Sequence, residues 1–162
     1  MAEKANFKTN ALRILENMKI NYTLHKYEHG DEFSGGLEIA EKLGQKPEQV
    51  FKTIVTHGQS RENYVFVLPV NKEIDFKAAA RAVGEKSIEM IKLTELTKIT
   101  GYIRGGCSPI GMKKKFRTVI DESCRSFDTI MVSAGKVGYQ MELAPSDLIK
   151  AAECDVTKIT QG

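Results

Sequence analysis

The sequence predicts an α+β fold in a single domain that covers residues 1–162. Segments with the character of strands outnumber helical segments, and most of them are short and apolar. Strands and helices do not alternate regularly, which argues against a doubly wound parallel sheet. A chain of 162 residues with 41% hydrophobic side chains is long enough to bury one core of its own.

The first half of the chain is predicted to begin with a helix. Thr9 can cap this helix, because a threonine hydroxyl accepts a hydrogen bond from an amide of the first turn. A second helix is expected to end at Gly44, and Pro47 suits the first turn of a short helix. The strands expected in this half lie at 22–27, 50–56 and 64–69.

The second half has two clear helix signals. Asp75 can cap an alanine-rich helix that stops at Gly84, and Pro145 can start a closing helix that runs through Ala151. A further helical turn is expected near 94–98. The strands expected in this half lie at 87–91, 102–104, 118–121, 129–133 and 139–143.

Composition excludes several classes of protein. Three cysteines without CxxC spacing argue against a disulfide framework and a structural zinc site, and the three histidines lack neighbouring ligands, so we expect no metal and no other cofactor. No apolar run approaches the ~20 residues that span a bilayer, and the first residues lack the apolar stretch of a secretory signal. We therefore expect a cytoplasmic protein with no membrane partner.

The charge balance does not by itself predict a nucleic-acid-binding protein. The chain has 24 basic and 21 acidic residues, a net charge of +3, so any contact with RNA has to be local. The best local candidate is the cluster of Lys113, Lys114, Lys115 and Arg117, which could contact phosphates. The alternative is a solvated turn, or an edge strand that its charges protect from aggregation.

Lys52 is the first candidate for a functional side chain. It lies inside the mostly apolar segment 50–56, where alternation places it on one face with Val50 and Ile54 and places Thr53 on the other. A lysine in this position either protects an edge strand or directs its charge into a cleft. The sequence pattern leaves both interpretations open.

The segment Gly105-Gly106-Cys107-Ser108-Pro109-Ile110-Gly111 predicts a rigid loop that can approach a ligand closely. Glycine has no Cβ to hold a ligand away, and proline restricts the backbone. The amides of such a loop can stabilise an anion or the oxygen of a tetrahedral intermediate. The alternative is a plain hairpin connection. Cys107 has no partner histidine that the sequence reveals, so we do not expect it to be a nucleophile.

These segments together resemble the YbaK family of free-standing aminoacyl-tRNA deacylases, which is related to the editing domain of bacterial prolyl-tRNA synthetases. The resemblance runs from Thr9 to Lys150 and rests on five motifs in register. They are Phe51-Lys52-Thr53, Gly101-Tyr102, the loop 105–111, Ser133-Ala134-Gly135-Lys136 and Glu142-Leu143-Ala144. The resemblance implies a strongly curved, barrel-like mixed sheet of about six or seven strands surrounded by helices.

The resemblance also implies a function, namely hydrolysis of mischarged Cys-tRNA(Pro) by an enzyme whose substrate supplies the attacking thiol. The partners would be the mischarged aminoacyl-tRNA and prolyl-tRNA synthetase. Rival interpretations are a deacylase of another mischarged tRNA that uses bound water, and a non-catalytic module that binds tRNA or the synthetase.

The residues implied fall into three groups. Those for catalysis are Lys52, Gly105 and Gly106, and those for tRNA binding are Lys113, Lys114, Lys115 and Arg117. Those for substrate binding are Tyr27, Thr53, Ser108, Pro109, Gly111, Ser133, Gly135 and Gln140. Some relatives have an aspartate where this chain has Gln140, so this residue would offer the substrate amine a weaker hydrogen bond than a carboxylate does.

Overall fold

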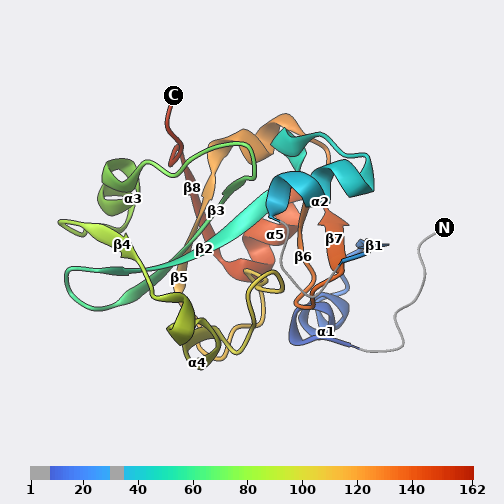
Figure 1. Cartoon of the computed structure of the whole chain (residues 1–162), viewed down its shortest axis with the longest axis horizontal. Helices are drawn as coiled ribbons and strands as arrows, with labels where there is room; N and C mark the ends of the chain where they lie inside the picture. The colour runs from blue at the N-terminus through green and yellow to red at the C-terminus, as the bar shows by residue number, and fades with distance from the viewer. Residues whose placement is uncertain (1–7, 30–34) are drawn as a thin grey trace.

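The computed structural model describes residues 8–29 and 35–162, which form two β-sheets with helices packed around them (Figure 1). The helices are α1 (Asn10–Asn17), α2 (Gly36–Leu43), α3 (Phe76–Val83), α4 (Leu96–Thr100) and α5 (Pro145–Ala152), with 3-10 turns at Pro47–Gln49, Leu93–Glu95 and Glu122–Ser126. The strands are β1 (Thr23–Lys26), β2 (Phe51–Gly58), β3 (Asn63–Pro69), β4 (Ile88–Met90), β5 (Arg117–Asp121), β6 (Ile130–Ser133), β7 (Tyr139–Leu143) and β8 (Cys154–Thr157).

The predicted α+β class is confirmed, but the prediction of one barrel-like sheet is wrong. The strands form a three-stranded sheet in the order β1-β7-β6 and a five-stranded sheet in the order β4-β2-β3-β5-β8, and neither sheet closes on itself. Figure 1 shows the two sheets side by side, with β2 extending from one toward the other. The alternation of residues shows which of them share a face of a strand, but not which strand lies alongside, so it could not correct this expectation.

The predicted caps place the helices correctly. Thr9 caps α1, because its Oγ1 accepts a hydrogen bond from the Leu12 amide at 3.2 Å. Asp75 caps α3 by accepting from two amides of the first turn, and Gly84 ends that helix with a φ of 73°. Pro145 is the first residue of α5.

Two features of the strands differ from the prediction. The segment 102–104 is not a strand, because the chain leaves α4 through Gly101 with a φ of 85° and the Tyr102 amide then donates to the Thr100 hydroxyl at 3.0 Å. Strand β8 was not predicted, and it pairs in parallel with β5 at the edge of the larger sheet. Its short, partly polar sequence, Cys154–Thr157, carries little of the apolar signal by which strands are recognised.

The main core joins the two sheets. Its buried side chains come from α1, α5 and both sheets and include Leu12, Leu15, Val65, Val67, Ile120, Ile130, Val132, Met141, Leu143 and Leu148. A second cluster packs α3 against the other side of the larger sheet, around Phe66, Leu68 and Val119. The shared core fixes β6 and β7 relative to β2, and this arrangement positions the site described below. Within residues 8–29 and 35–162, no helix is long and apolar enough to span a membrane.

Candidate active site

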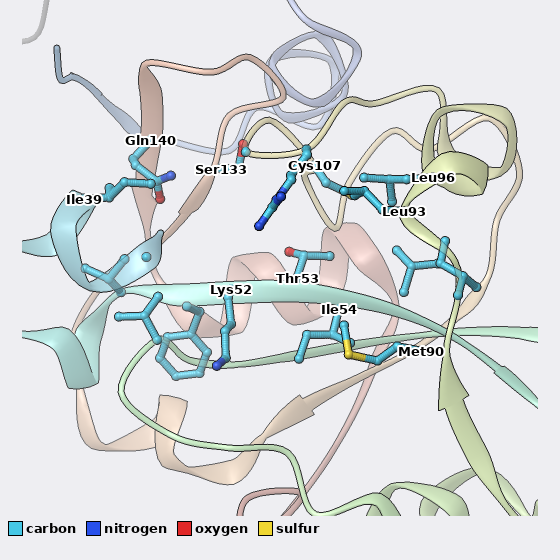
Figure 2. Close-up of a pocket in the computed structure, with 18 residues that line it drawn as sticks. Ile39, Lys52, Thr53, Ile54, Met90, Leu93, Leu96, Cys107, Ser133 and Gln140 are labelled. Atoms are coloured by element: carbon cyan, nitrogen blue, oxygen red, sulfur yellow. The ribbon is translucent and has the colours of Figure 1, made fainter. Parts of the chain in front are cut away.

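A cavity of about 440 Å³ lies where the two sheets meet, and β2 forms one of its walls (Figure 2). The rest of the lining comes from α2, the end of β4 with the helical turns that follow it, the glycine loop with Arg104, the strands β6 and β7, and Val70 after β3. The predicted site residues that line the cavity are Lys52, Thr53, Gly105, Ser133 and Gln140. Residues that are up to 88 positions apart in the sequence therefore line one cavity.

Strand β2 contributes Lys52 and Thr53 to the cavity on opposite sides. Figure 2 shows Thr53 directed toward Cys107, whereas Lys52 and Ile54 leave the strand on the other side. The pairing of β2 with β3 agrees with this. Lys52 lies opposite Leu68, which belongs to the second cluster, whereas Thr53 lies opposite Val67, which belongs to the main core on the other side of the sheet. Lys52 is partly exposed, so its ammonium can reach solvent or a bound anion.

Only the first half of the glycine loop reaches this cavity. Gly105 and Cys107 line it, whereas Pro109 and Gly111 line a different cavity of about 350 Å³ behind the loop. Ser108 is fully buried, and its Oγ accepts a hydrogen bond from the Ile110 amide at 3.3 Å. Among the residues predicted to bind substrate, Ser108, Pro109 and Gly111 are thus placed to hold the loop in shape.

Gly106 is buried between the loop and the turn at 136–137. Its amide donates to the Ile103 carbonyl at 2.9 Å, so this N–H is already used within the loop. A Cβ at this position would lie 3.0 Å from the Val137 nitrogen and 3.3 Å from the Lys136 backbone. The glycine is therefore required by close packing of two backbone segments.

Two side-chain hydroxyls hold the glycine loop and the turn after Ser133 in place. The Tyr102 hydroxyl donates to the Ile110 carbonyl at 2.6 Å, and Thr9 Oγ1 donates to the Ala134 carbonyl at 2.6 Å. Gly111 and Gly135 both have a positive φ and pack so closely that an added Cβ would lie less than 3 Å from Tyr102. Gly135, which was predicted to bind substrate, thus positions the turn that follows Ser133.

The smaller sheet contributes Ser133 and Gln140, which lie opposite each other in the pairing of β6 with β7. Ser133 Oγ accepts a hydrogen bond from the Gly135 amide at 3.2 Å. Gln140 is only 4% exposed, and within the described part of the chain its Oε1 has no hydrogen-bond partner. A buried acceptor without a partner on the wall of a cavity is available to a ligand donor.

Tyr27 does not line the cavity in the described structure. It is buried, its ring meets that of His29 edge to face at a centroid distance of 6.4 Å, and its amide donates to the Gly138 carbonyl at 2.9 Å. Over residues 8–29 and 35–162 its hydroxyl has no hydrogen-bond partner. Tyr27 therefore holds the turn at 135–138 through its backbone hydrogen bond to Gly138.

Sequence reasoning missed the residues of the opposite wall. Leu93, Leu96 and Met90 line the cavity, and Leu93 and Met90 are each more than half exposed. Arg104, the residue before the glycine pair, also lines it. The position of Arg104 beside the loop was a usable signal, whereas isolated exposed leucines and methionines are common on protein surfaces and predict nothing alone.

Cys107 is a thiol of low reactivity. Burial raises its pKa to about 11, so it is protonated near neutral pH and is a poor nucleophile in that form.

We expect alkylation of Cys107 by iodoacetamide to accelerate about tenfold per pH unit up to pH ~11, because only the thiolate reacts. Peptide mass spectrometry across a pH series, with glutathione as the reference thiol, measures this. A plateau below pH 9 would show that the thiol is activated.

The side chains of the basic cluster differ in the contacts they make within the protein. The guanidinium of Arg117 donates to Asp155 at 3.1 Å and to the carbonyls of Val83 and Ala82 at 3.3 and 3.1 Å, so it joins β5 to β8 and α3. Lys115 forms an ion pair with Glu153 at the surface. This geometry gives Arg117 a structural role and leaves Lys113, Lys114 and Lys115 as the candidates for phosphate contacts.

Two of the three histidines are each paired with a single carboxylate. His25 Nε2 lies 2.7 Å from Glu142 Oε1, and His57 Nε2 lies 3.7 Å from Glu89 Oε2. Across the described ranges, no three His, Cys, Asp or Glu side chains are grouped so that they could hold a metal ion.

Comparison with known proteins agrees with the resemblance seen in the sequence. The family described as "Aminoacyl-tRNA editing domain" matches residues 37–151. The chain is 42% identical over 158 residues, 98% of its length and 96% of the relative's, to the "Putative Cys-tRNA(Pro)/Cys-tRNA(Cys) deacylase EbsC" of Enterococcus faecalis.

More distant relatives extend this comparison. A segment of 103 residues, 63% of the chain, is 26% identical to 18% of the proline–tRNA ligase of Thermosipho melanesiensis. The fold matches the crystal structure of "a putative trans-editing enzyme for prolyl tRNA synthetase" with a TM-score of 0.82 at 20% identity, over 97% of this chain and 100% of that one. The predictions of the family and of an aminoacyl-tRNA deacylase are thus confirmed: the chain belongs to the aminoacyl-tRNA editing domain family.

Proposed function

We propose that the protein is a trans-editing enzyme that deacylates Cys-tRNA(Pro), with the thiol of the substrate as the nucleophile. The observation that carries this proposal is the composition of the cavity. Among the described residues that line it there is no histidine and no carboxylate, and its one thiol has a pKa raised to about 11. Such a site can supply shape and electrostatic stabilisation, but among the described residues it offers neither a histidine nor a carboxylate as a general base.

In the proposed reaction the cysteinyl sulfur attacks the carbonyl carbon of its own ester. The new C–S bond forms as the bond from that carbon to the ribose oxygen breaks, and the thiol proton is transferred to the ribose oxygen. The products are deacylated tRNA and a four-membered thiolactone, which water opens to free cysteine. The enzyme accelerates this reaction by holding sulfur and carbonyl in an attacking geometry.

The cavity residues have distinct roles in this proposal. The Lys52 ammonium binds the terminal phosphate or sugar of the tRNA and orients the ester. The backbone of Gly105 faces the ester, Gly106 holds this part of the loop in place, and Thr53 and Ser133 surround the aminoacyl group. The unpartnered Gln140 Oε1 accepts a hydrogen bond from the substrate ammonium.

A separate hydrolytic enzyme is needed because a synthetase pocket cannot fully discriminate between amino acids of similar size. Cysteine and proline are similar in size, and a difference of one methylene in an apolar pocket is worth only about 1–3 kcal/mol. Similarity to part of a proline–tRNA ligase supports tRNA(Pro) as the carrier and prolyl-tRNA synthetase as a partner. Contacts from Lys113, Lys114 and Lys115 to phosphates would then make tRNA binding weaken as salt is added.

Blocking the substrate thiol tests the proposed mechanism. We expect S-methylcysteinyl-tRNA(Pro) to be deacylated at least about 100-fold more slowly than Cys-tRNA(Pro), because a thioether has no proton to lose and cannot form the thiolactone. Single-turnover kinetics with both substrates measure the ratio, and the rates without enzyme are the control. Equal enzymatic rates would mean that bound water is the nucleophile.

A further inference from the structure

The backbone N–H and C=O groups of successive residues in β2 point alternately to its two edges. The Gly58 amide donates to the Glu62 carbonyl at 2.9 Å, and the Val50 carbonyl accepts from the Val70 amide at 2.8 Å. Both bonds belong to the antiparallel pairing with β3, so the even-numbered residues of β2 direct their N–H and C=O groups toward β3. The odd-numbered residues must direct theirs toward the other edge.

That other edge is covered at its two ends. At the C-terminal end, β4 pairs with β2 as far as Thr56 opposite Met90, and the Ile91 amide adds a bond of 3.2 Å to the Val55 carbonyl. At the N-terminal end, Val50 forms a bridge to Met131 of β6. Between these contacts lies Thr53, opposite which the described residues place no strand.

The cavity occupies this gap. Phe51, Thr53 and Val55, whose backbone groups face this edge, all line it, and Figure 2 shows β2 crossing the site with Ile39 toward one end and Leu93 toward the other. The Thr53 N–H and C=O therefore point at the space where a ligand would bind. An open sheet edge is a ready partner for another main-chain-like group.

We propose that the aminoacyl ester binds in this gap as the missing strand partner of Thr53. An aminoacyl group carries an ammonium donor and a carbonyl acceptor on either side of one Cα, the same arrangement that a strand residue offers in a hydrogen-bonded antiparallel pair. The Thr53 N–H donates to the ester carbonyl oxygen, and the Thr53 C=O accepts from the ammonium. This inference rests on the proposed function.

The pairing has two consequences for the reaction. The Thr53 N–H stabilises the negative charge that develops on the carbonyl oxygen during attack. Residues directly opposite each other in an antiparallel pair project side chains to the same face, so the substrate side chain lies on the Thr53 side of β2, toward Cys107, and away from Lys52.

The test replaces a backbone N–H without changing the side chain. Substitution of Thr53 by its α-hydroxy acid analogue replaces the backbone amide by an ester and so removes the Thr53 N–H. Because this N–H points away from β3, no N–H donor of the pairing between β2 and β3 is removed. We expect single-turnover deacylation of Cys-tRNA(Pro) to slow by about 100-fold or more. The same change at His57, an odd-numbered residue that β4 covers, should leave the rate within about threefold. A Thr53 variant as fast as the His57 variant overturns the proposal.

Hydrogen exchange provides a second measurement, which does not depend on the folding of a variant. The ligand is 3′-cysteinylamino-3′-deoxyadenosine, in which an amide replaces the labile ester. When it saturates the wild-type protein, exchange of the Thr53 amide should slow by at least about tenfold. Unchanged Thr53 exchange in the saturated protein overturns the proposal. Wild-type protein that neither binds this compound nor deacylates Cys-tRNA(Pro) refutes the proposed function itself.

Discussion

Replacement of Lys52 by alanine is expected to slow single-turnover deacylation of Cys-tRNA(Pro) by about 100-fold or more. Lys52 lines the cavity, but it is not part of any buried hydrophobic cluster, so its loss should change substrate positioning and not folding. Arginine should not restore the rate, because a planar guanidinium cannot take the place of a compact ammonium in a shaped cavity. The measurement is the rate constant at saturating enzyme, with thermal unfolding recorded for each variant.

Lys26 supplies the matched control for Lys52. It is also a strand lysine, exposed on β1, and it does not line the cavity. Lys26→Ala should deacylate Cys-tRNA(Pro) within about twofold of the wild-type rate. If Lys52→Ala behaves in the same way, Lys52 is only a charge that protects the edge of β2, which is the alternative that its sequence pattern left open.

Gly106→Val is expected to abolish most activity through the shape of the loop. The new Cβ would meet the Val137 nitrogen at 3.0 Å, and the two methyl groups beyond it would force the loop away from the turn at 136–137. Both segments carry cavity residues, since Gly105 precedes the substitution and Ser133 precedes the turn. We expect a loss of about 100-fold in the single-turnover rate and a lower melting temperature.

A graded substitution separates shape from unfolding. Gly106→Ala adds only the Cβ, so it should reduce the rate and the melting temperature less than Gly106→Val does. Both variants are assayed at least 15 °C below their own melting temperatures, so that the folded fraction does not limit the rate. Full activity of Gly106→Val under these conditions would remove the loop from the active site.

Local chemistry made much of this protein predictable. Thr9, Asp75 and Gly84 mark helix ends through hydrogen bonds and a positive φ that involve only neighbouring residues. Lys52 and Gly105 stand out because a charge in an apolar strand and a glycine pair are unusual wherever they lie in the fold. For these features the sequence carries the physical cause within a few residues.

Features that depend on pairing across the chain could not be predicted in this way. The division into two sheets depends on which strands become neighbours, and the pairing of β8 with β5 leaves no local pattern. In the sequence Arg117 belongs to a basic run, but the residues that accept its hydrogen bonds lie 34 to 38 positions away. The gap opposite Thr53 exists only because β4 and β6 stop short of each other along β2.

Catalysis by the substrate thiol can be tested by a single-turnover comparison of four substrates carried by tRNA(Pro), namely cysteinyl, alanyl, seryl and prolyl esters. We expect the wild-type protein to deacylate the cysteinyl ester at least about 100-fold faster than the other three, because only cysteine brings its own thiol to a cavity whose described lining has no histidine and no carboxylate. Seryl-tRNA is the closest control, since it differs from the cysteinyl ester by one atom. Deacylation of the alanyl or seryl ester as fast as that of the cysteinyl ester would show that the substrate thiol is not the nucleophile.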